Sequence, residues 1–554
     1  MNKKVCSFPI LFALLALVVG TCAVVFPASA QAAPTSTGSI TVSGTVASSY
    51  DAYQIFSANV VDGDSDAKIA TDLTWASDAA RDAALPVLHS AGMPNSQTTA
   101  QEAAEWLNTD SHLTSALSAQ LARSLQSSGA VFVALNAGTA AELHCGYWLI
   151  VADDAIAQGE TGTAPIMALV GGSAVAVKPK AATPKVAKHV LEDGTAAWGK
   201  AADATVADDL YWRLSATVPA GLTAYDTYTV QFVDTMGAGL APSKVAASMR
   251  VYVAAGADGG FDAVSTGKDG RAGTEPAKGW TDITSQCATK VAADGTFTVR
   301  TGDLIAALGG TEAFTAGARV VAVYNAPLNS ACNHGIAKGN PNEVYLRYPR
   351  SPFADQSGDA GFTRTPSDDA CAYTWDLALT KRGSDGDKPL AGAVLSITDD
   401  RGRTLAADGT WDAEGKATVT TGDDGRVTVS GVDSGKLEVR ELKAPKGYTA
   451  FEGTRSVTVK AEGLDVDQVA AAKPKLTITA ESPLRADSAD GSTGSLEASL
   501  INTPTGTPPS ITTGGFMPST GDMAMYAAAA AAVAGAALIV VALLVKRGGG
   551  SHKE

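Results

Sequence analysis

The sequence predicts a mainly β protein made of tandem immunoglobulin-like β-sandwich modules. The chain has 554 residues, of which 18% are charged, 6% are aromatic and 56 are glycine, and this composition suits β modules with many turns. At about 150 residues a domain, the length corresponds to three or four domains. Apolar segments with basic flanks stand near both ends, so we also expect an N-terminal signal peptide and a C-terminal transmembrane helix.

Residues 1–30 have the three parts of a secretory signal peptide. Lys3 and Lys4 precede an apolar core, and small residues follow at 28–30. This order is typical of export signals, and we predict cleavage after residue 30. The mature chain is therefore expected to be secreted.

Export permits disulfides among the cysteines that remain after cleavage. They are Cys145, Cys287, Cys332 and Cys371. Four cysteines allow three complete pairings, and the sequence alone does not choose among them. Cys332 and Cys371 flank one strand-rich stretch, so this pair is the preferred disulfide, whereas a free buried thiol is the alternative for Cys145.

Residues 35–175 predict a first module of mixed type, in which helices are inserted into β structure. Alternating apolar and polar residues in "TGSITVSGTVASSYDAYQIF" indicate strands. Thr99 and Glu102 have the spacing of a capping box ahead of a helical stretch, "AAEWLNTDSHLTSALSAQLARSL". Strand-like segments such as "CGYWLIVAD" then close the module.

The rest of the chain divides into two β modules and a C-terminal anchor region. Short alternating runs separated by turn residues predict β-sandwiches over 180–365 and 372–503. Residues 504–521 form a Pro/Thr/Gly-rich linker. The apolar run 522–545 exceeds the ~20 residues that span a bilayer, and the basic tail 546–554 is expected to stay in the cytoplasm.

Composition and motifs argue against several functional classes. The formal net charge is −15, and no concentrated basic face is evident, so we do not expect nucleic-acid binding. The sequence has no nucleophile elbow, no P-loop and no zinc-ligand spacing, and its six histidines are scattered. We therefore expect no metal, no cofactor and no enzymatic activity on an external substrate.

Three blocks of the third module occur in a recognisable order: "LALTKRGSDGDKPLAGAVLSI", "LEVRELKAPKGYTA" and "SLINTP". They resemble the Cna B-type domain of Gram-positive surface proteins, which has a Lys in its first strand, a Glu before Ala-Pro-x-Gly-Tyr, and an Asn that closes the last strand. The resemblance implies a Cna-type β-sandwich in which Lys381 and Asn502 form an isopeptide bond, with Glu441 as the catalytic acid.

Burial explains why this chemistry would proceed without an added enzyme. A buried lysine loses its charge more easily and becomes nucleophilic, while a buried glutamic acid stays protonated and can polarise the carbonyl. The fold holds the amine and the carboxamide together, and the bond forms with loss of ammonia. The alternative is that Lys381, Glu441 and Asn502 are an unrelated strand lysine, surface glutamate and turn asparagine.

The second module contains "TPKVAKHV", "YTVQFVDTMGAGL" and "VVAVYNAPLNSACNHGIAKGNPNEVYLRYPRSP". These stretches resemble the central domain of fimbrial major subunits, where a first-strand Lys bonds to an Asn near the end of the domain. The resemblance places Lys188 as the lysine and Asp234 as the acid. Pro349 and Arg350 stand where the family has Ser and the bonding Asn, and Arg has no carboxamide. This leaves the bond from Lys188 open, and a Cys332–Cys371 disulfide is our hypothesis for a cross-link that replaces it.

A short basic stretch, "SAVAVKPKAATPK", joins the first two modules. It resembles the strand-end Pro-Lys pair of fimbrial shaft subunits, whose lysine accepts the neighbouring subunit. Lys180 is the best match and Lys178 the second. The alternative is a basic interdomain linker without this role.

Residues 517–521, Met-Pro-Ser-Thr-Gly, precede the apolar run and the basic tail. They resemble the Leu-Pro-x-Thr-Gly motif of sortase substrates, with Met517 in place of Leu and Pro518 and Ser519 following it. The resemblance implies that a sortase cleaves between Thr520 and Gly521 and passes Thr520 to an amine. A permanent membrane anchor is the alternative.

The order of these parts resembles Gram-positive sortase-assembled major pilins, the fimbrial backbone subunits. The resemblance implies a structural protein of the cell surface that is covalently polymerised and finally attached to the cell wall. Its implied partners are sortase, further copies of the chain, peptidoglycan, accessory pilins and host surface ligands. The alternative function is a wall-anchored adhesin or minor pilin that binds host matrix or glycans through the first module.

Overall fold

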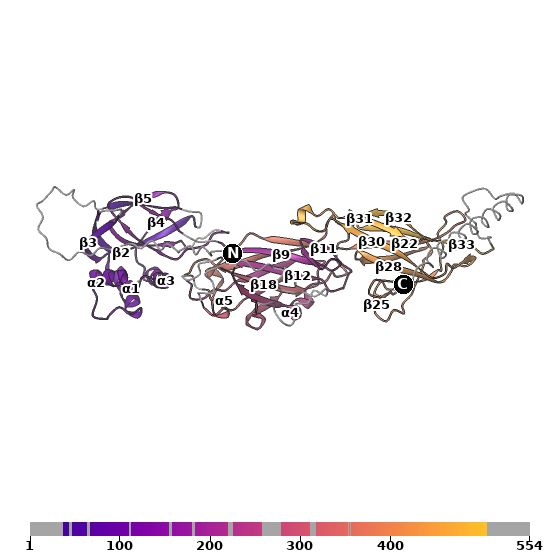
Figure 1. Ribbon diagram of the computed structural model, residues 1–554, viewed down its shortest axis with the longest axis horizontal. Helices are drawn as coiled ribbons and strands as arrows, with labels where there is room; N and C mark the ends of the chain where they lie inside the picture. Colours follow the sequence, from indigo (N-terminus) through magenta and orange to yellow (C-terminus); the bar gives the residue numbers. More distant parts are fainter. Residues whose placement is uncertain are drawn as a thin grey trace, which may run out of the picture.

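The computed structural model describes residues 37–43, 47–63, 67–109, 112–153, 158–179, 183–219, 225–256, 279–310, 317–352, 354 and 356–506. Within these ranges the chain is mainly β, and it forms three β-rich modules that follow one another along the long axis of the molecule (Figure 1). The predicted fold class is thus confirmed for the described residues. The predicted signal peptide, the predicted sorting motif and the apolar run 522–545 lie outside them.

The first module combines two sheets with three helices. One sheet has the order β3-β2-β6-β7, with β4 also paired to β2, and the other has the order β5-β1-β8. The strands are β1 (Thr37–Val42), β2 (Ser49–Asp62), β3 (Lys68–Trp75), β4 (Phe132–Asn136), β5 (Ala140–His144), β6 (Gly146–Ala152), β7 (Ile166–Val170) and β8 (Val175–Val177). The helices are α1 (Asp78–Ser90), α2 (Ala100–Asn108) and α3 (Ser115–Ser127).

The helices of the first module pack on one side of its larger sheet (Figure 1). Leu88 of α1 and Leu125 of α3 are fully buried in the same apolar cluster as Leu149 of β6. The Thr99 side chain caps the N-terminus of α2, and the Thr99 backbone N–H donates to the Glu102 carboxylate. The predicted capping box is therefore confirmed.

The second module is a sandwich of two sheets. Their orders are β10-β9-β12-β18-β14-β15 and β11-β21-β19-β13-β17-β16, with β20 paired to β19. The strands are β9 (Lys185–Glu192), β10 (Ala197–Gly199), β11 (Ala201–Asp203), β12 (Tyr211–Val218), β13 (Gln231–Met236), β14 (Arg250–Ala255), β15 (Thr281–Asp282), β16 (Ala288–Val291), β17 (Thr296–Arg300), β18 (Ala318–Asn325), β19 (Asn340–Pro349), β20 (Phe362–Arg364) and β21 (Asp368–Tyr373); the short helices are α4 (Val245–Ser248) and α5 (Leu304–Ala307).

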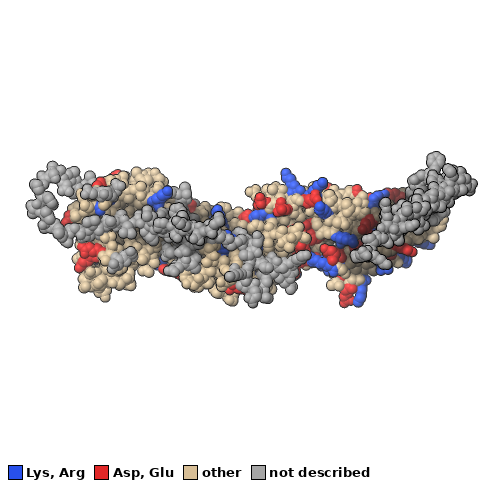
Figure 2. All heavy atoms as spheres, in the orientation of Figure 1, with Lys and Arg blue, Asp and Glu red and all other residues tan. Residues whose placement is uncertain are grey.

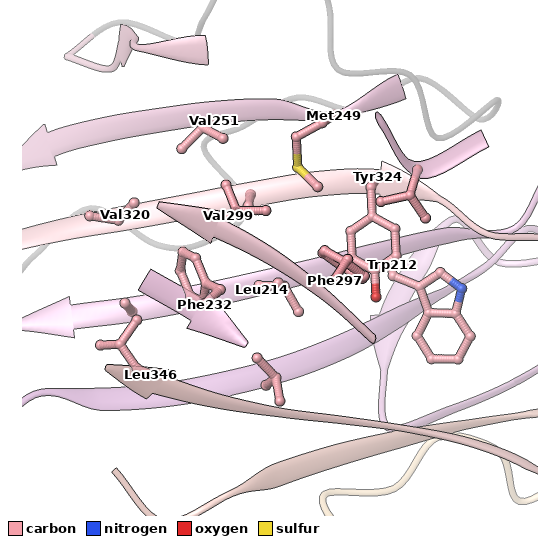
Figure 3. Close-up of a cluster of buried hydrophobic side chains, with 14 of the residues drawn as sticks. Trp212, Leu214, Phe232, Met249, Val251, Phe297, Val299, Val320, Tyr324 and Leu346 are labelled. Carbon is pink, nitrogen blue, oxygen red and sulfur yellow. The ribbon is translucent and has the colours of Figure 1, made fainter. Parts of the chain in front are cut away.

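Aromatic and branched side chains from both sheets fill the centre of the second module (Figure 3). Trp212 and Phe232 are fully buried there. The rings of Phe297 and Tyr324 meet edge to face, with centroids 4.7 Å apart. Such contacts between facing sheets fix their separation, so a polar side chain that points inward here has no access to solvent.

The third module is a second two-sheet sandwich. One sheet has the order β27-β22-β33-β29, with β32 paired to β33, and the other has the order β25-β24-β23-β28-β30-β31, with β26 paired to β23. The strands are β22 (Trp375–Gly383), β23 (Val394–Thr398), β24 (Thr404–Leu405), β25 (Trp411–Asp412), β26 (Val419–Thr420), β27 (Arg426–Val432), β28 (Gly435–Lys443), β29 (Tyr448–Thr449), β30 (Thr454–Glu462), β31 (Lys475–Ala480), β32 (Leu484–Asp490) and β33 (Ser495–Pro504).

The boundary between the second and third modules lies further along the chain than we predicted. Strand β21 pairs with β19 and β11, so residues 368–373 complete a sheet of the second module. The third module begins with β22 at Trp375. Apolar and polar residues alternate through both strands, so the sequence pattern does not indicate where the second module ends and the third begins.

The predicted disulfide between Cys332 and Cys371 is not formed in the structure. Both residues are free, as is Cys287. Cys332 is buried in the core of the second module, whereas Cys371 is buried in the core of the third. The two side chains thus face different cores, which explains why they do not pair. Cys145 is buried and forms no disulfide, as the alternative given for it predicted.

Charged side chains are unevenly spread over the face shown in Figure 2, where they are most frequent over the third module. No helix among the described residues is long and apolar enough to cross a membrane. The segment that we predict to do so, 522–545, lies beyond the described part of the chain.

Candidate cross-linking sites

The third module brings its three predicted site residues together. Lys381 lies on the first strand, β22, and Asn502 on the last strand, β33. These strands are parallel neighbours, with Lys381 opposite Leu500 and Gly383 opposite Asn502. Glu441 comes from β28 in the facing sheet. The site therefore spans both sheets of the sandwich.

The distances place the acid between the lysine and the asparagine. The amide nitrogen of Asn502 donates to both carboxylate oxygens of Glu441, at 2.9 and 3.0 Å. The Lys381 amine lies 3.7 Å from Glu441 Oε1 and donates to the Leu500 carbonyl at 3.1 Å. The backbone N–H of Phe451 donates to Glu441 Oε2 at 3.1 Å and helps to fix the carboxyl group.

Burial makes the Lys381 amine a better nucleophile. The residue is 0% exposed, and this burial lowers its pKa to about 8, although the nearby Glu441 acts in the opposite direction. A much larger share of the amine is then neutral near physiological pH than for an exposed lysine. Glu441 and Asn502 are also buried, so water has little access to the reacting groups.

The orientation of Asn502 differs from the one we expected. We expected the acid to polarise the carbonyl oxygen, but Glu441 contacts the amide nitrogen. Within the described part of the chain, Asn502 Oδ1 has no hydrogen-bond partner. The amide nitrogen is the group that leaves as ammonia. This arrangement suits Glu441 to deliver a proton to the leaving nitrogen.

The second module buries a similar set around Lys188 of β9. Its amine pairs with Asp234 of β13, from the facing sheet, and both side chains are 0% exposed. Burial lowers the pKa of Lys188 to about 8 and raises the pKa of Asp234. These shifts favour a neutral amine beside a neutral acid, which is the state that nucleophilic attack requires.

The structure supplies the carboxamide that the sequence comparison did not find. Asn342 of β19 is fully buried, and its amide nitrogen donates to the Tyr324 hydroxyl at 2.9 Å. That hydroxyl also accepts from Lys188 at 2.9 Å. Among the described residues Asn342 Oδ1 has no hydrogen-bond partner, as is true of Asn502 Oδ1 in the third module. The second module thus contains a buried lysine, acid and asparagine.

Asn342 escaped prediction because the family motif drew attention to the end of the strand. Along β19 buried positions alternate with more exposed ones. Asn342 lies on the same face as the buried Val344 and Leu346. A polar residue in such an apolar series was the available signal. Arg350, at the position where the bonding Asn was expected, instead accepts a hydrogen bond at its carbonyl from Gly162 of the first module at 2.5 Å.

The predicted intermolecular residues are only partly described. Lys178 is exposed and directly follows β8. Lys180 and the sorting motif at 517–521 lie outside the described residues. Their roles remain predictions.

Comparison of the sequence with known protein families assigns the third module to a class. Residues 376–473 match the SpaA family, a prealbumin-like fold domain. A particular relative is the trypsin-resistant surface T6 protein of Streptococcus pyogenes serotype M6, which is 30% identical over 143 residues. That match covers 24% of this chain, and the chain spans about a quarter (24%) of the T6 protein.

Two solved structures of pilins show partial similarity to this chain. The T6 backbone pilin of serotype M6 Streptococcus pyogenes has 17% identity and a TM-score of 0.47, covering 86% of this chain and 100% of that one. The major pilin SpaD of Corynebacterium diphtheriae has 16% identity and a TM-score of 0.43, covering 84% and 98%. These values assign no residue of this chain a role.

Proposed function

We propose that this chain is a structural pilus subunit of the Gram-positive cell surface, stabilised by an internal isopeptide bond in each of its last two modules. The observation that carries this proposal is the pair of buried lysine, acid and asparagine sets. Each set links the two sheets of a sandwich, and a buried charged lysine would otherwise be costly. The resemblance of the sequence to sortase-assembled major pilins supports the same conclusion.

In the third module the Lys381 amine attacks the side-chain carbonyl carbon of Asn502. A new amide bond forms, the bond to the Asn502 amide nitrogen breaks, and that nitrogen leaves as ammonia. Glu441 lies close to both nitrogens and moves protons between them. The sandwich holds the reactants in contact, which replaces a bimolecular encounter.

Between subunits, we propose that a sortase joins Thr520 of one chain to Lys180 of the next, with Lys178 as the second choice of acceptor. Residues 522–545 then hold the chain in the membrane only until cleavage. Polymer growth ends when the last subunit is transferred to peptidoglycan. In this proposal the chain is a substrate of sortase and has no catalysis beyond its own cross-links.

A wall extract separated in SDS tests the polymer. We expect a ladder of regularly spaced species in the parent strain and only monomer for Lys180→Ala, with Lys185→Ala as the matched control that keeps the ladder. A ladder that survives Lys180→Ala would move the acceptor to Lys178 or another lysine. A parent without any ladder would favour the wall-anchored adhesin instead.

Intact-mass measurement tests the internal bonds. The parent chain should weigh less than its sequence by two ammonia molecules, and Asn342→Ala and Asn502→Ala should each restore one. Glu441→Ala should restore the one that belongs to the third module. A parent chain of full sequence mass would rule out both bonds.

A further inference from the structure

The hydroxyl of Tyr324 lies at the centre of the buried set in the second module. It accepts hydrogen bonds from Lys188 Nζ and from Asn342 Nδ2, both at 2.9 Å, and it donates to Asp234 Oδ2 at 3.1 Å. It therefore contacts the attacking nitrogen, the leaving nitrogen and the acid at the same time. Among the hydrogen bonds of the described residues, none joins Asp234 directly to Asn342.

In the third module the acid contacts the leaving nitrogen directly, and no hydroxyl lies between them in the contacts described above. There Glu441 reaches Asn502 directly, with contacts of 2.9 and 3.0 Å. Aspartate is shorter than glutamate by one methylene group, so Asp234 needs a bridge to the leaving nitrogen. Tyr324 fills this gap. The two modules thus differ in a way that gives the hydroxyl a specific task.

We propose that Tyr324 is a catalytic residue in the formation of the Lys188–Asn342 bond, carrying a proton from Asp234 to the leaving nitrogen of Asn342. This inference rests on the proposed bond in the second module. It adds a fourth residue to the reaction. It also explains how Asp234 can protonate the amide nitrogen of Asn342 without contacting it directly.

The reaction begins with a proton transfer inside the buried site. The Lys188 ammonium gives one proton to Asp234, which leaves a neutral amine and a neutral acid. The Lys188 nitrogen then forms a bond to the Asn342 Cγ atom, and the carbonyl electron pair moves to Oδ1. When that pair returns, the bond between Cγ and Nδ2 breaks, and its electrons stay on Nδ2.

The Tyr324 hydroxyl acts at this second step. Its proton turns toward Nδ2 and is transferred, while the oxygen takes the proton that Asp234 holds, so ammonia leaves and Tyr324 is unchanged. The new amide nitrogen still carries one proton too many and returns it to Asp234. The products are the isopeptide, ammonia and a neutral Asp234. A neutral carboxyl group is the favoured form of an acid in this apolar site.

The surroundings hold the hydroxyl in place and keep it protonated. Tyr324 is 0% exposed, and its ring packs against Phe297 at 4.7 Å between centroids (Figure 3). Burial raises the pKa of Tyr324 well above its ordinary value. The hydroxyl can therefore both accept and donate a proton without becoming a buried anion.

The experiment measures how fast the bond forms in the full chain. All variants carry Lys381→Ala, so that any loss of ammonia reports on the second module alone. Chains are made by cell-free synthesis and sampled over time, and the linked Lys188 and Asn342 peptides are quantified after digestion. Tyr324→Phe removes only the hydroxyl. Tyr348→Phe is the matched control, because it removes a buried hydroxyl that donates to Glu160 at 2.7 Å, away from the reacting atoms.

We expect the Tyr324→Phe chain to form the bond at least about 100-fold more slowly than the parent, in the range of lost general acid–base catalysis, while Tyr348→Phe keeps the parent rate. A parent rate in Tyr324→Phe would overturn the role of Tyr324 but leave the bond intact. A parent chain without linked peptides would instead remove the bond itself.

A second measurement separates catalysis from folding. Tyr324→Phe is combined with Asn342→Ala, which cannot cross-link, and its thermal unfolding is compared with that of Asn342→Ala alone. We expect both to unfold cooperatively with similar midpoints. If only the double variant loses its cooperative transition, the slow reaction reflects lost packing, and the proposal fails.

Discussion

At the scale of single residues, the notable feature is a lysine buried in each of two sandwich cores. Lys188 and Lys381 are both 0% exposed. A buried ammonium is expensive, and the usual outcome is a lowered pKa or a close partner. Both lysines have a lowered pKa and an acid nearby. Conversion to an amide removes the charge altogether, so the proposed bond also removes the cost of burial.

The titration of Lys381 predicts how stability depends on pH when the bond cannot form. Without the bond, the folded-state pKa of Lys381 is about 8, below the ordinary value of 10.5, and Asn502→Ala keeps the chain in this unlinked state. Between these pH values the unfolded chain binds more protons, so stability rises with pH. Below about pH 8 the buried amine is charged in the folded chain, and the full free-energy cost of burying it remains. Chemical denaturation from pH 7 to 10.5 should show this rise in Asn502→Ala.

The control for this pH dependence is a second substitution, Lys381→Met, in the Asn502→Ala chain. Methionine fills the same space without a titrating group. The rise between pH 8 and 10.5 should disappear in the double variant. An equal rise in both chains would assign the effect to other groups.

Single residues also show how far the sequence could predict the sites. Lys381, Glu441 and Asn502 stand in three separate blocks that resemble a known pattern, and the fold brings them together. Asn342 was not predicted, because the family motif pointed to the end of β19, although its position in the alternating series of inward residues was a usable signal. The Cys332 pairing was wrong because residues that flank one stretch can face different cores.

At the scale of elements, the proposed bond joins the first and last strands of the third module. Strands β22 and β33 are parallel neighbours, and Lys381 and Asn502 bracket about 120 residues of chain. Closing a loop of this length stabilises a fold by about 4–5 kcal/mol, if the bond behaves like a disulfide. Force applied at the two ends of the module would then pass through a covalent link.

Glu441→Gln tests this stabilisation, because it keeps the size of the side chain but removes the acid. We expect the variant to stay uncross-linked and to unfold about 10–20 °C below the parent. Differential scanning calorimetry of the full chain measures the shift, and Glu438→Gln, an exposed change on the same strand, should leave the transition in place. A Glu441→Gln chain that stays uncross-linked yet melts with the parent would show that the bond does not stabilise the module.

Elements with strong local patterns were predictable, and those built from weak patterns were not. The cap of α2 follows from two residues at a fixed spacing, and it was confirmed. Helix α1 was not predicted, because it contains Pro86 and buries mainly small alanines. Its apolar stripe is therefore faint, and its stability comes from packing against α3 and the sheet.

At the scale of the whole molecule, charged contacts join the second and third modules. Arg401 and Arg403 of the third module both bind Asp208 of the second, at 2.5–2.9 Å, and Asp208 is only 9% exposed. Bidentate pairing of this kind fixes orientation as well as distance. The sequence could not indicate this contact, since its members are about 200 residues apart.

Removal of Asp208 should loosen this junction. Asp208→Ala removes the carboxylate that Arg401 and Arg403 share, although Arg401 keeps Asp193 and Arg403 keeps Asp399 as acidic partners. The lost contacts should cost about 2–3 kcal/mol of the free energy that holds the two modules together. Spin labels on the two modules should report a broader distance distribution, while each module keeps its own melting transition. Asp226→Ala, which removes an exposed partner of Arg123 at the other junction, is the control. An unchanged distribution in Asp208→Ala would show that other contacts hold the modules.

The same junction carries a group of carboxylates that should make it sensitive to pH. Oxygens of Glu192, Asp193 and Asp433 lie within 4.8 Å of one another. Burial, with the charge of Asp203 in addition, raises the pKa of Glu192 to about 8 from an ordinary value of 4.5. The folded chain thus keeps a proton that the unfolded chain releases, and stability falls as pH rises from about 4.5 to 8.

Glu192→Gln should remove part of the fall in stability at rising pH, because glutamine cannot ionise. The variant should gain stability over the parent as pH increases from 5 to 8, and the two should be nearly equal near pH 4.5. Denaturant unfolding at several pH values measures the difference, and Glu105→Gln, at an exposed position on α2, should follow the parent throughout. A constant difference between Glu192→Gln and the parent at all pH values would contradict the raised pKa and would point to a packing effect at the junction.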